Sequence, residues 1–297
     1  MSLQSFDLAL RRAVGADHQW LQSHFNSTVV FWYGPLLPGL LSYFRDFIEE
    51  ELAKCPKAGQ RQLVMVLNTP GGVAEVVEKM VEIIRAHFDH VTFVVPAYAM
   101  SAGTILCMSG DKIMMDYSSS LGPVDPQVQD NEKKLIPAMG YLDEVENMVT
   151  KSTSGDLSGA ELMMLQRLDL GRLNAYKSAK ELTITLLKDW LVRFKFKTWT
   201  EHRSDPDKKG QPVTEDEKLE RASEIASLLA NNKHWKSHGR YISMNTLKNV
   251  IRLEIDDFGN DSNLRDHLRA YHDTLVEMIT RAELPVFLHG VTTWTTN

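Results

Sequence analysis

Ser101 is the residue of this sequence best placed to act as a nucleophile. It stands in the run Ala99-Met100-Ser101-Ala102-Gly103-Thr104, after a strand-like segment and before a helix-like one. Small neighbours leave room for a substrate backbone to approach the hydroxyl. A serine at the start of a helix can also be a plain N-cap, so the residue type alone does not decide between the two roles.

A second run, Asn68-Thr69-Pro70-Gly71-Gly72, places two glycines just before another helix-like segment. Exposed backbone N–H groups at a helix start can stabilise a developing negative charge. Alone, the run is also typical of a tight turn between a strand and a helix. One helix and one strand separate it from Ser101, so a βαβ unit would bring the two loops together. We then expect Gly71 or Gly72, with Ala102, to supply N–H groups that hold an oxyanion.

The elements that must position these loops alternate between strand and helix. The predicted strands are 27–34, 62–69, 90–97 and 111–116, and the predicted helices are 39–54, 73–88 and 101–109. Continuous apolar runs such as QLVMVLNT are typical of strands covered on both faces. The alternation predicts parallel strands with helical crossovers, an α/β fold.

After about residue 130 the sequence becomes mostly helical. Two predicted helices begin with capping boxes, Ser158 with Glu161 and Thr214 with Glu217. We divide the chain into a helical lead-in at 1–27, an αβ core at 28–135 that carries the site, and a mostly helical region at 136–297. The last region is expected to pack on the core and in oligomer contacts.

Composition excludes several classes of function. The net charge of −6 gives no reason to expect a nucleic-acid partner. The run VRFKFKTW (192–199) alternates basic and aromatic residues, but on an acidic chain this favours an amphipathic helix end over a nucleic-acid contact. Cys55 and Cys107 are too few for a disulfide framework and indicate reduced thiols.

Targeting and cofactor signals are also missing from the sequence. No run provides the ~20 apolar residues of a membrane span, and the first residues contain no signal-peptide core. We find no phosphate-binding loop, dinucleotide fingerprint or metal-ligand spacing. We therefore expect a cytoplasmic protein without a cofactor, metal or membrane span.

The order LNTPGG, then AMSAGT, then GDKIMMDYSSSLGPVDPQ resembles the Clp-protease and crotonase superfold. The likeness is greatest to the serine dehydrogenase proteinase group, with signal peptide peptidase A as a more distant relative, and it covers residues 28–130 best. It implies a spiral of ββα units, a nucleophile at Ser101, oxyanion donors at Gly72 and Ala102, and a homo-oligomer. It also implies a serine peptidase acting on peptides or unfolded proteins through an acyl-enzyme.

The sequence offers several candidates for the general base. The loop SSSLGPVDPQ contains no histidine, so the Clp order of catalytic residues does not apply. The serine–aspartate–histidine order of the serine dehydrogenase proteinases implies Asp125 as the acid and a later histidine as the base. We favour His238, in KSHGRYIS, over His234. The remaining late histidines are expected to be solvated, namely His202, His267, His272 and His289.

Resemblance to signal peptide peptidase A leaves a lysine base open. Lys177, in NAYKSAKEL, would fill that role, with Lys180 and Lys151 as weaker candidates. A lysine acts as a base only when its ammonium is removed from water. Asp111 and Asp116, on either side of the KIMM run, are expected to be turn residues.

Three other functions remain open on the sequence. A crotonase-type acyl-CoA enzyme would use the same N–H donors, but it would leave Ser101 idle. An α/β-hydrolase would match the Ser…Asp…His order, although Ala99 replaces the first glycine of its nucleophile motif. A catalytically decayed assembly or scaffold protein on the same fold would explain the missing histidine.

Overall fold

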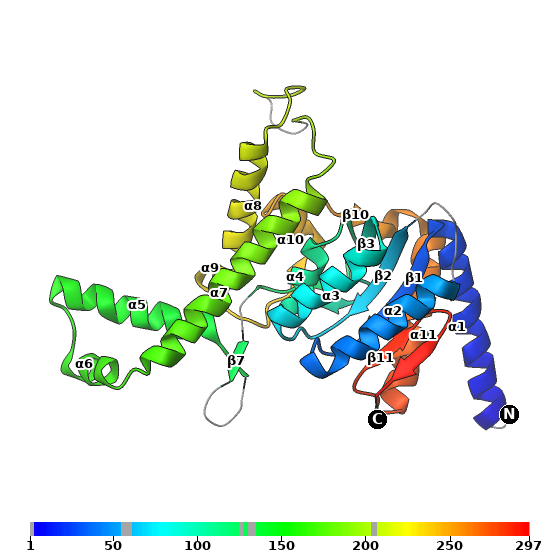
Figure 1. Ribbon diagram of the computed structural model, residues 1–297, viewed down its shortest axis with the longest axis horizontal. Coiled ribbons are helices and arrows are strands. Elements are labelled where there is room, and N and C mark those ends of the chain that lie inside the picture. The colour runs from blue at the N-terminus through cyan, green and yellow to red at the C-terminus, as the bar shows by residue number, and fades with distance from the viewer. Residues whose placement is uncertain (1–2, 55–60, 125–126, 130–134, 203–206, 297) are drawn as a thin grey trace.

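The computed structural model describes residues 3–54, 61–124, 127–129, 135–202 and 207–296. A seven-stranded sheet forms its centre, with helices on both faces (Figure 1). In spatial order the strands are β10 (Asp256–Asp257), β5 (Lys112–Met115), β3 (His90–Val94), β2 (Gln62–Asn68), β1 (Thr28–Tyr33), β11 (Phe287–His289) and β12 (Thr293–Thr295). From β10 to β1 the pairing is parallel, and β11 and β12 add two antiparallel strands. The mixed α/β architecture agrees with the predicted fold class.

Successive side chains of the central strands point to opposite faces of the sheet and belong to two separate hydrophobic cores. Val30 and Trp32 of β1 face one side, and Val29 and Phe31 face the other. On the first side pack α2 (Leu41–Lys54), α3 (Ala74–His87), α4 (Ala102–Met108), α7 (Leu170–Trp190) and α8 (Glu215–Leu229). On the second side pack α1 (Leu3–Phe25) and α11 (Ser262–Arg281). Burial on both faces explains why these strands read as unbroken apolar runs.

The chain after β5 leaves the sheet and later returns to it. In Figure 1, α5 (Ala138–Ser154), α6 (Gly159–Gln166) and the first part of α7 extend away from the body, in green. Both predicted capping boxes form, at the starts of α6 and α8. The remaining elements are η1 (Pro38–Leu40), β7 (Gln127–Gln129), β8 (Leu135–Pro137), η2 (Leu191–Lys195), α9 (Asn232–Trp235), α10 (Met244–Asn249) and η3 (Phe258–Asn260).

A smaller sheet lies next to the segment that contains Ser101. Its order is β4 (Tyr98–Ala99), β6 (Ser120–Leu121) and β9 (Ile242–Ser243). β4 pairs parallel with β6, and β6 pairs antiparallel with β9. The segment just before β9 is therefore carried back alongside the strands that flank Ser101.

A buried carboxylate joins the antiparallel edge to the body. Glu51 of α2 has no exposed surface. Its two oxygens accept hydrogen bonds from the Val291 N–H (2.8 Å), the Thr292 N–H (2.7 Å) and the Thr292 hydroxyl (2.6 Å) in the turn between β11 and β12. One side chain thus satisfies most of the polar groups of that turn.

Replacing Glu51 with alanine is expected to destabilise the fold by about 2–4 kcal/mol, because it leaves buried N–H donors unsatisfied. Urea unfolding followed by circular dichroism would measure the change. Glu50→Ala is the matched control, because Glu50 is exposed and, within the described part of the chain, pairs with Lys54 of the same helix alone. Equal unfolding midpoints for the two variants would contradict the role given to Glu51.

Candidate active site

The two loops singled out by the sequence lie side by side. The Thr69 N–H donates to the Tyr98 carbonyl (3.1 Å), and the Met100 N–H donates to the Thr69 carbonyl (3.0 Å). These bonds extend β2 and β4 into a short parallel bridge between Thr69 and Ala99. The glycine loop and the serine loop consequently leave the carboxyl ends of neighbouring strands together, where parallel sheets place ligands.

Ser101 occupies a strained backbone conformation at the start of α4. Its φ is 50° and its ψ is −113°. A non-glycine residue held in such a region costs about 1–3 kcal/mol, and such residues cluster at functional sites. Within the described chain the Ser101 hydroxyl does not cap the helix and forms no hydrogen bond. The plain N-cap role is therefore not the one this serine plays.

Gly71 packs directly against the serine. Its φ is +107°, and a Cβ built on it would lie 2.7 Å from the Met100 carbonyl oxygen and 3.0 Å from Ser101 Cβ. Glycine is required here both by the positive φ and by this close approach. The close fit sets the distance between the glycine loop and Ser101.

Gly72 and Ala102 present the candidate oxyanion donors. Leu36 pins the glycine loop, since its N–H donates to the Gly71 carbonyl (2.9 Å) and its carbonyl accepts from the Val73 N–H (3.0 Å). This parallel bridge turns the Gly72 N–H away from Leu36. Ala102 is the first residue of α4, where N–H groups have no partner inside the helix. Both groups can therefore serve an external acceptor near Ser101.

Thr104 is a positioning residue that sequence reasoning missed. It is fully buried, and its hydroxyl oxygen lies 2.9 Å from the Ala99 carbonyl and 2.9 Å from the Gly122 carbonyl, while accepting the Gly122 N–H at 3.0 Å. The side chain joins the ends of β4 and β6 on either side of the serine. A small polar residue within an apolar helical run was the available signal.

His238 lies in the segment that the small sheet carries toward the site. It precedes β9 by four residues, and β9 pairs with β6 beside β4. Burial raises the pKa of Tyr98, and the nearby phenols of Tyr33 and Tyr241 raise it further, which places Tyr241 close to the strand that leads into Ser101. Burial also lowers the pKa of His238, so its imidazole is neutral at physiological pH.

The other predicted site residues are placed less favourably or not at all. Asp125 lies outside the described residues. His234 is exposed on α9, where its ring meets Trp235 edge-on. Lys177 is exposed on α7, away from the burial that a lysine base requires. The roles assigned to Asp125, His238 and Lys177 stay predictions.

His272, expected to be solvated, is instead buried. Only 6% of its surface is exposed, and burial lowers its pKa. Its Nε2 lies 3.0 Å from Asn68 Nδ2, and its Nδ1 lies 2.8 Å from the Asp273 carboxylate. The pair fixes the end of β2, one residue before the glycine loop, to α11. The charged residues around it in sequence concealed an inward-facing position of the helix.

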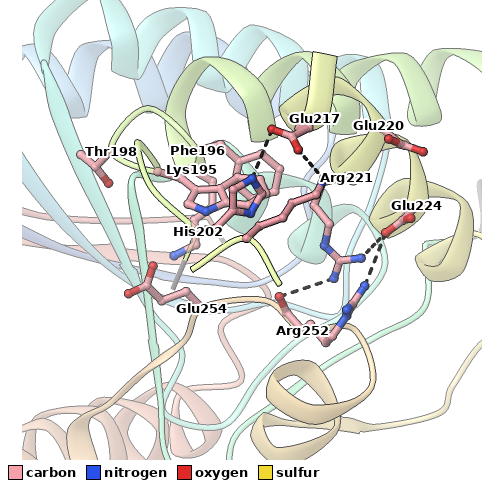
Figure 2. Close-up of a pocket in the computed structure, with 12 residues that line it drawn as sticks. Lys195, Phe196, Thr198, His202, Glu217, Glu220, Arg221, Glu224, Arg252 and Glu254 are labelled. Atoms are coloured by element: carbon pink, nitrogen blue, oxygen red, sulfur yellow. Dashed lines mark hydrogen bonds and ion pairs between the residues drawn. The ribbon is translucent and has the colours of Figure 1, made fainter. Parts of the chain in front are cut away.

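Neither recorded cavity involves the serine. One of about 410 Å³ is lined by the chain around Lys195, by α8 and by the segment before β10 (Figure 2). A second, of about 350 Å³, lies against the first residues of β2, β3 and β5. Both are on the amino side of the sheet, opposite the carboxyl ends that lead to Ser101.

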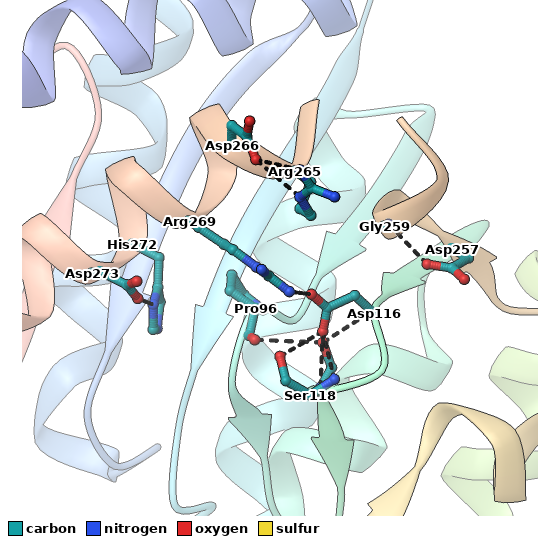
Figure 3. Close-up of polar contacts among 11 residues, drawn as sticks. Pro96, Asp116, Ser118, Asp257, Gly259, Arg265, Asp266, Arg269, His272 and Asp273 are labelled. Atoms are coloured by element: carbon teal, nitrogen blue, oxygen red, sulfur yellow. Dashed lines mark hydrogen bonds and ion pairs between the residues drawn. The ribbon is translucent and has the colours of Figure 1, made fainter. Parts of the chain in front are cut away.

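Asp116 has the structural role expected of a turn acid (Figure 3). One oxygen accepts from the Ser118 N–H (2.8 Å) and hydroxyl (2.7 Å), and the other pairs with Arg269 of α11 (2.5 Å). Burial opposes its ionisation, but the Ser118 and Arg269 contacts hold the pKa of Asp116 below its usual value. Asp111 likewise has a structural role, because it forms an ion pair with Arg85 (2.9 Å).

A membrane-spanning helix and a metal-binding cluster are both absent from the described ranges. None of the helices there is long and apolar enough to cross a membrane. In the same residues no group of three histidine, cysteine or acidic side chains could hold a metal ion. Cys107 is buried, which raises its thiol pKa, and Cys55 falls outside the described part.

Comparison with known proteins gives a family match. A family model described as ClpP-like SDH-type serine proteinase matches residues 51–206, just over half of the chain. Two uncharacterised proteins of Methanocaldococcus jannaschii are similar, one 36% identical over 81 residues and the other 30% identical over 125 residues. These matches cover 27% and 42% of this chain and 28% and 38% of the relatives, so the chain spans well under half of their length.

Two solved structures are similar at low identity. Both are mutants of the 1510-N membrane-bound stomatin-specific protease, one of them in complex with a substrate peptide. They are 21% and 19% identical, with TM-scores of 0.31 and 0.30. The matches cover 39% and 42% of this chain and 54% and 62% of those chains.

Proposed function

Because the chain belongs to the family of ClpP-like SDH-type serine proteinases, we propose that it hydrolyses peptide bonds with Ser101 as the nucleophile. The observation that carries this proposal is the strained Ser101 backbone packed against Gly71, with an unused hydroxyl. A serine kept in this conformation without a structural bond is consistent with a reacting group.

The proposed reaction passes through an acyl-enzyme. The Ser101 hydroxyl attacks the peptide carbonyl while a base takes its proton, and the carbonyl oxygen becomes an oxyanion. The N–H groups of Gly72 and Ala102 hydrogen-bond that oxyanion. The leaving amine takes the proton back, and water then hydrolyses the ester by the same route in reverse. Substrates are proposed to be peptides or unfolded proteins, and the active form a homo-oligomer.

His238 is the proposed base and Asp125 the proposed acid. The half-buried position of His238 and its lowered pKa support this role, because only the neutral imidazole can accept the serine proton. Catalytic hydrogen bonds are often long in a substrate-free protein and shorten when substrate binds. The absence of a hydrogen bond from the Ser101 hydroxyl within the described chain is therefore compatible with activity.

The direct test is covalent labelling combined with turnover. We expect a fluorophosphonate probe to modify Ser101, located by peptide mass spectrometry, and the wild-type chain to degrade an unfolded protein such as denatured casein. Labelling at a different serine would show that the nucleophile is that serine and not Ser101. A wild-type protein that neither labels nor cleaves would contradict the proposal.

Removing the base gives a prediction in pH. His238→Ala is expected to lower kcat/KM by roughly 10²–10⁴-fold. In the wild type, kcat/KM should fall only below the depressed pKa of His238, where the imidazole becomes protonated, so activity extends to lower pH than an ordinary histidine allows. This acidic limb should disappear in the variant.

His234→Ala, on the exposed α9 position, is the matched control and should keep both the rate and the acidic limb. Lys177→Met tests the lysine alternative on the same plots. An unchanged limb in His238→Ala, together with a large loss in Lys177→Met, would transfer the role to the lysine.

A further inference from the structure

The basic and aromatic run at 192–199 forms an unusual end to α7. Its first residues belong to η2, a turn of π-helix, in which the Phe196 N–H donates to the Leu191 carbonyl five residues earlier (2.7 Å). Such turns are frequent at functional sites. Phe196 is mostly buried, and Lys195, Phe196 and Trp199 all line the cavity of about 410 Å³. The π-turn therefore delivers a lysine to a cavity wall.

The cavity suits a small ligand. Its volume of about 410 Å³ lies in the range of small-molecule sites. The rings of Phe196 and Trp199 meet edge-to-face, with centroids 5.4 Å apart, and give an aromatic wall. The remaining lining is rich in charges of both signs from α8 and from the segment before β10.

Most of these charges are already paired (Figure 2). Glu217 accepts from Lys208 (2.7 Å) and lies 3.2 Å from His202 Nε2. Glu224 pairs with Arg221 and, at 3.8 Å, with Arg252. These contacts occupy Glu217, Arg221 and Glu224 of α8. The exposed Glu220 of the same helix forms none among the described residues.

Lys195 and Glu254 differ from the paired groups. Among the described residues neither side chain forms a hydrogen bond or an ion pair. Burial lowers the pKa of Lys195, and Glu254 is the charge that most strongly opposes this effect, ahead of Asp256. Both side chains line the cavity, and their charges lie farther apart than the ~4 Å of an ion pair. Lys195 is half-buried, whereas Glu254 is exposed. A partly buried charge such as that of Lys195 is normally paired, so the lysine calls for an anionic partner.

We propose that this cavity binds a free α-amino acid with an apolar side chain. The ligand carboxylate would accept from the Lys195 ammonium, its ammonium would donate to Glu254, and its side chain would lie on Trp199 and Phe196. A zwitterion carries both charges on one small scaffold. A simple anion would instead be repelled by Glu254 and Glu220, and the interior of a peptide offers neither charge.

The site is separate from Ser101. The charged neighbours of Lys195 include Lys112 and Asp111, at the start of β5, and Asp256 of β10. Ser101 follows β4, past the opposite ends of the strands. Binding at the cavity can consequently be measured whether or not the chain cleaves peptides.

Isothermal titration of the full chain with L-phenylalanine tests the proposal, with L-leucine as a second ligand. We expect saturable one-to-one binding of both. Phenethylamine, which lacks the carboxylate, and 3-phenylpropionate, which lacks the amine, should each bind about 10–100-fold more weakly, since each loses one charge-assisted contact. These analogues need no altered protein, so folding does not affect the result.

Lys195→Gln and Glu254→Gln should each weaken L-phenylalanine binding by about 10–100-fold. Lys197→Gln is the matched control, because Lys197 is exposed and lines the second cavity. Thermal melting would verify that the variants fold. The proposal is overturned by the absence of saturable binding up to ~10 mM ligand, beyond the range of weak affinities. Equal binding of the analogues, or an equal loss in Lys197→Gln, would also overturn it.

Discussion

Ser101→Ala is expected to abolish fluorophosphonate labelling and to lower peptide hydrolysis by roughly 10⁴-fold or more, because the proposed acyl-enzyme is formed on this hydroxyl. The hydroxyl makes no hydrogen bond to the described chain, so its removal leaves no polar partner unsatisfied. Probe labelling of purified protein and the rate of release from a fluorogenic peptide would measure the two effects.

Ser109→Ala is the matched control. Ser109 is also buried, stands at the other end of α4, and donates to the Leu106 carbonyl at 2.7 Å. We expect this variant to keep its labelling and its activity, even if it loses some stability. Residual labelling of Ser101→Ala at the wild-type rate would place the nucleophile elsewhere.

Backbone strain supplies a second readout at the same position. Ser101→Gly should be as inactive as the alanine variant yet more stable than it, by about 1 kcal/mol or more, because glycine accepts a positive φ without steric cost. If the strained backbone at Ser101 served packing alone, changes in activity and changes in stability at this position would not be connected. Urea unfolding of both variants, beside the activity assay, separates chemistry from stability.

The central sheet could be predicted from the sequence because its strands are buried on both faces. The runs at 62–69 and 90–97 became β2 and β3 within a few residues, and the loop after β2 came to lie beside Ser101 as expected. Apolar continuity and turn residues are local signals, and a right-handed βαβ crossover converts them into a position.

Elements that depend on distant partners could not be predicted in this way. β11 and β12 have three residues each, and β4 and β6 have two. Segments so short have no periodicity of their own and become strands only because a neighbouring strand supplies their hydrogen bonds. The anchoring of β11 and β12 by Glu51, 240 residues away in sequence, is likewise visible only in three dimensions.

The candidate site likewise has one part that local sequence signals predict and another that depends on tertiary packing. Residue types identified Ser101 and the glycine pair, whereas the backbone angles of Ser101 and the hydroxyl contacts of Thr104 follow from tertiary packing. His272 was misjudged because charged neighbours in sequence do not reveal which face of a helix is turned inward. The position of His238 depends on the pairing of β9 with β6, and the local sequence around His238 does not specify that pairing.

Gly71→Ala is expected to lower kcat/KM by about 10²–10³-fold, the usual cost of losing oxyanion stabilisation. The new methyl group would lie 2.7 Å from the Met100 carbonyl oxygen, at a φ of +107° that alanine rarely adopts. Met100 cannot yield freely, because the same oxygen accepts the Gly103 N–H (2.8 Å) in the first turn of α4. Relief of the clash must therefore move Ser101 and the Ala102 N–H away from the glycine loop.

Gly39→Ala provides the comparison, since a Cβ there would meet no atom within 4 Å. It should retain full activity. Circular dichroism and melting would show that Gly71→Ala is folded, and a slower but detectable probe reaction at Ser101 would show that the nucleophile is present while the oxyanion site is displaced. Full activity in Gly71→Ala would mean that the two loops need not be held at this distance. The Gly72 and Ala102 N–H groups would then not be the donors that bind the oxyanion.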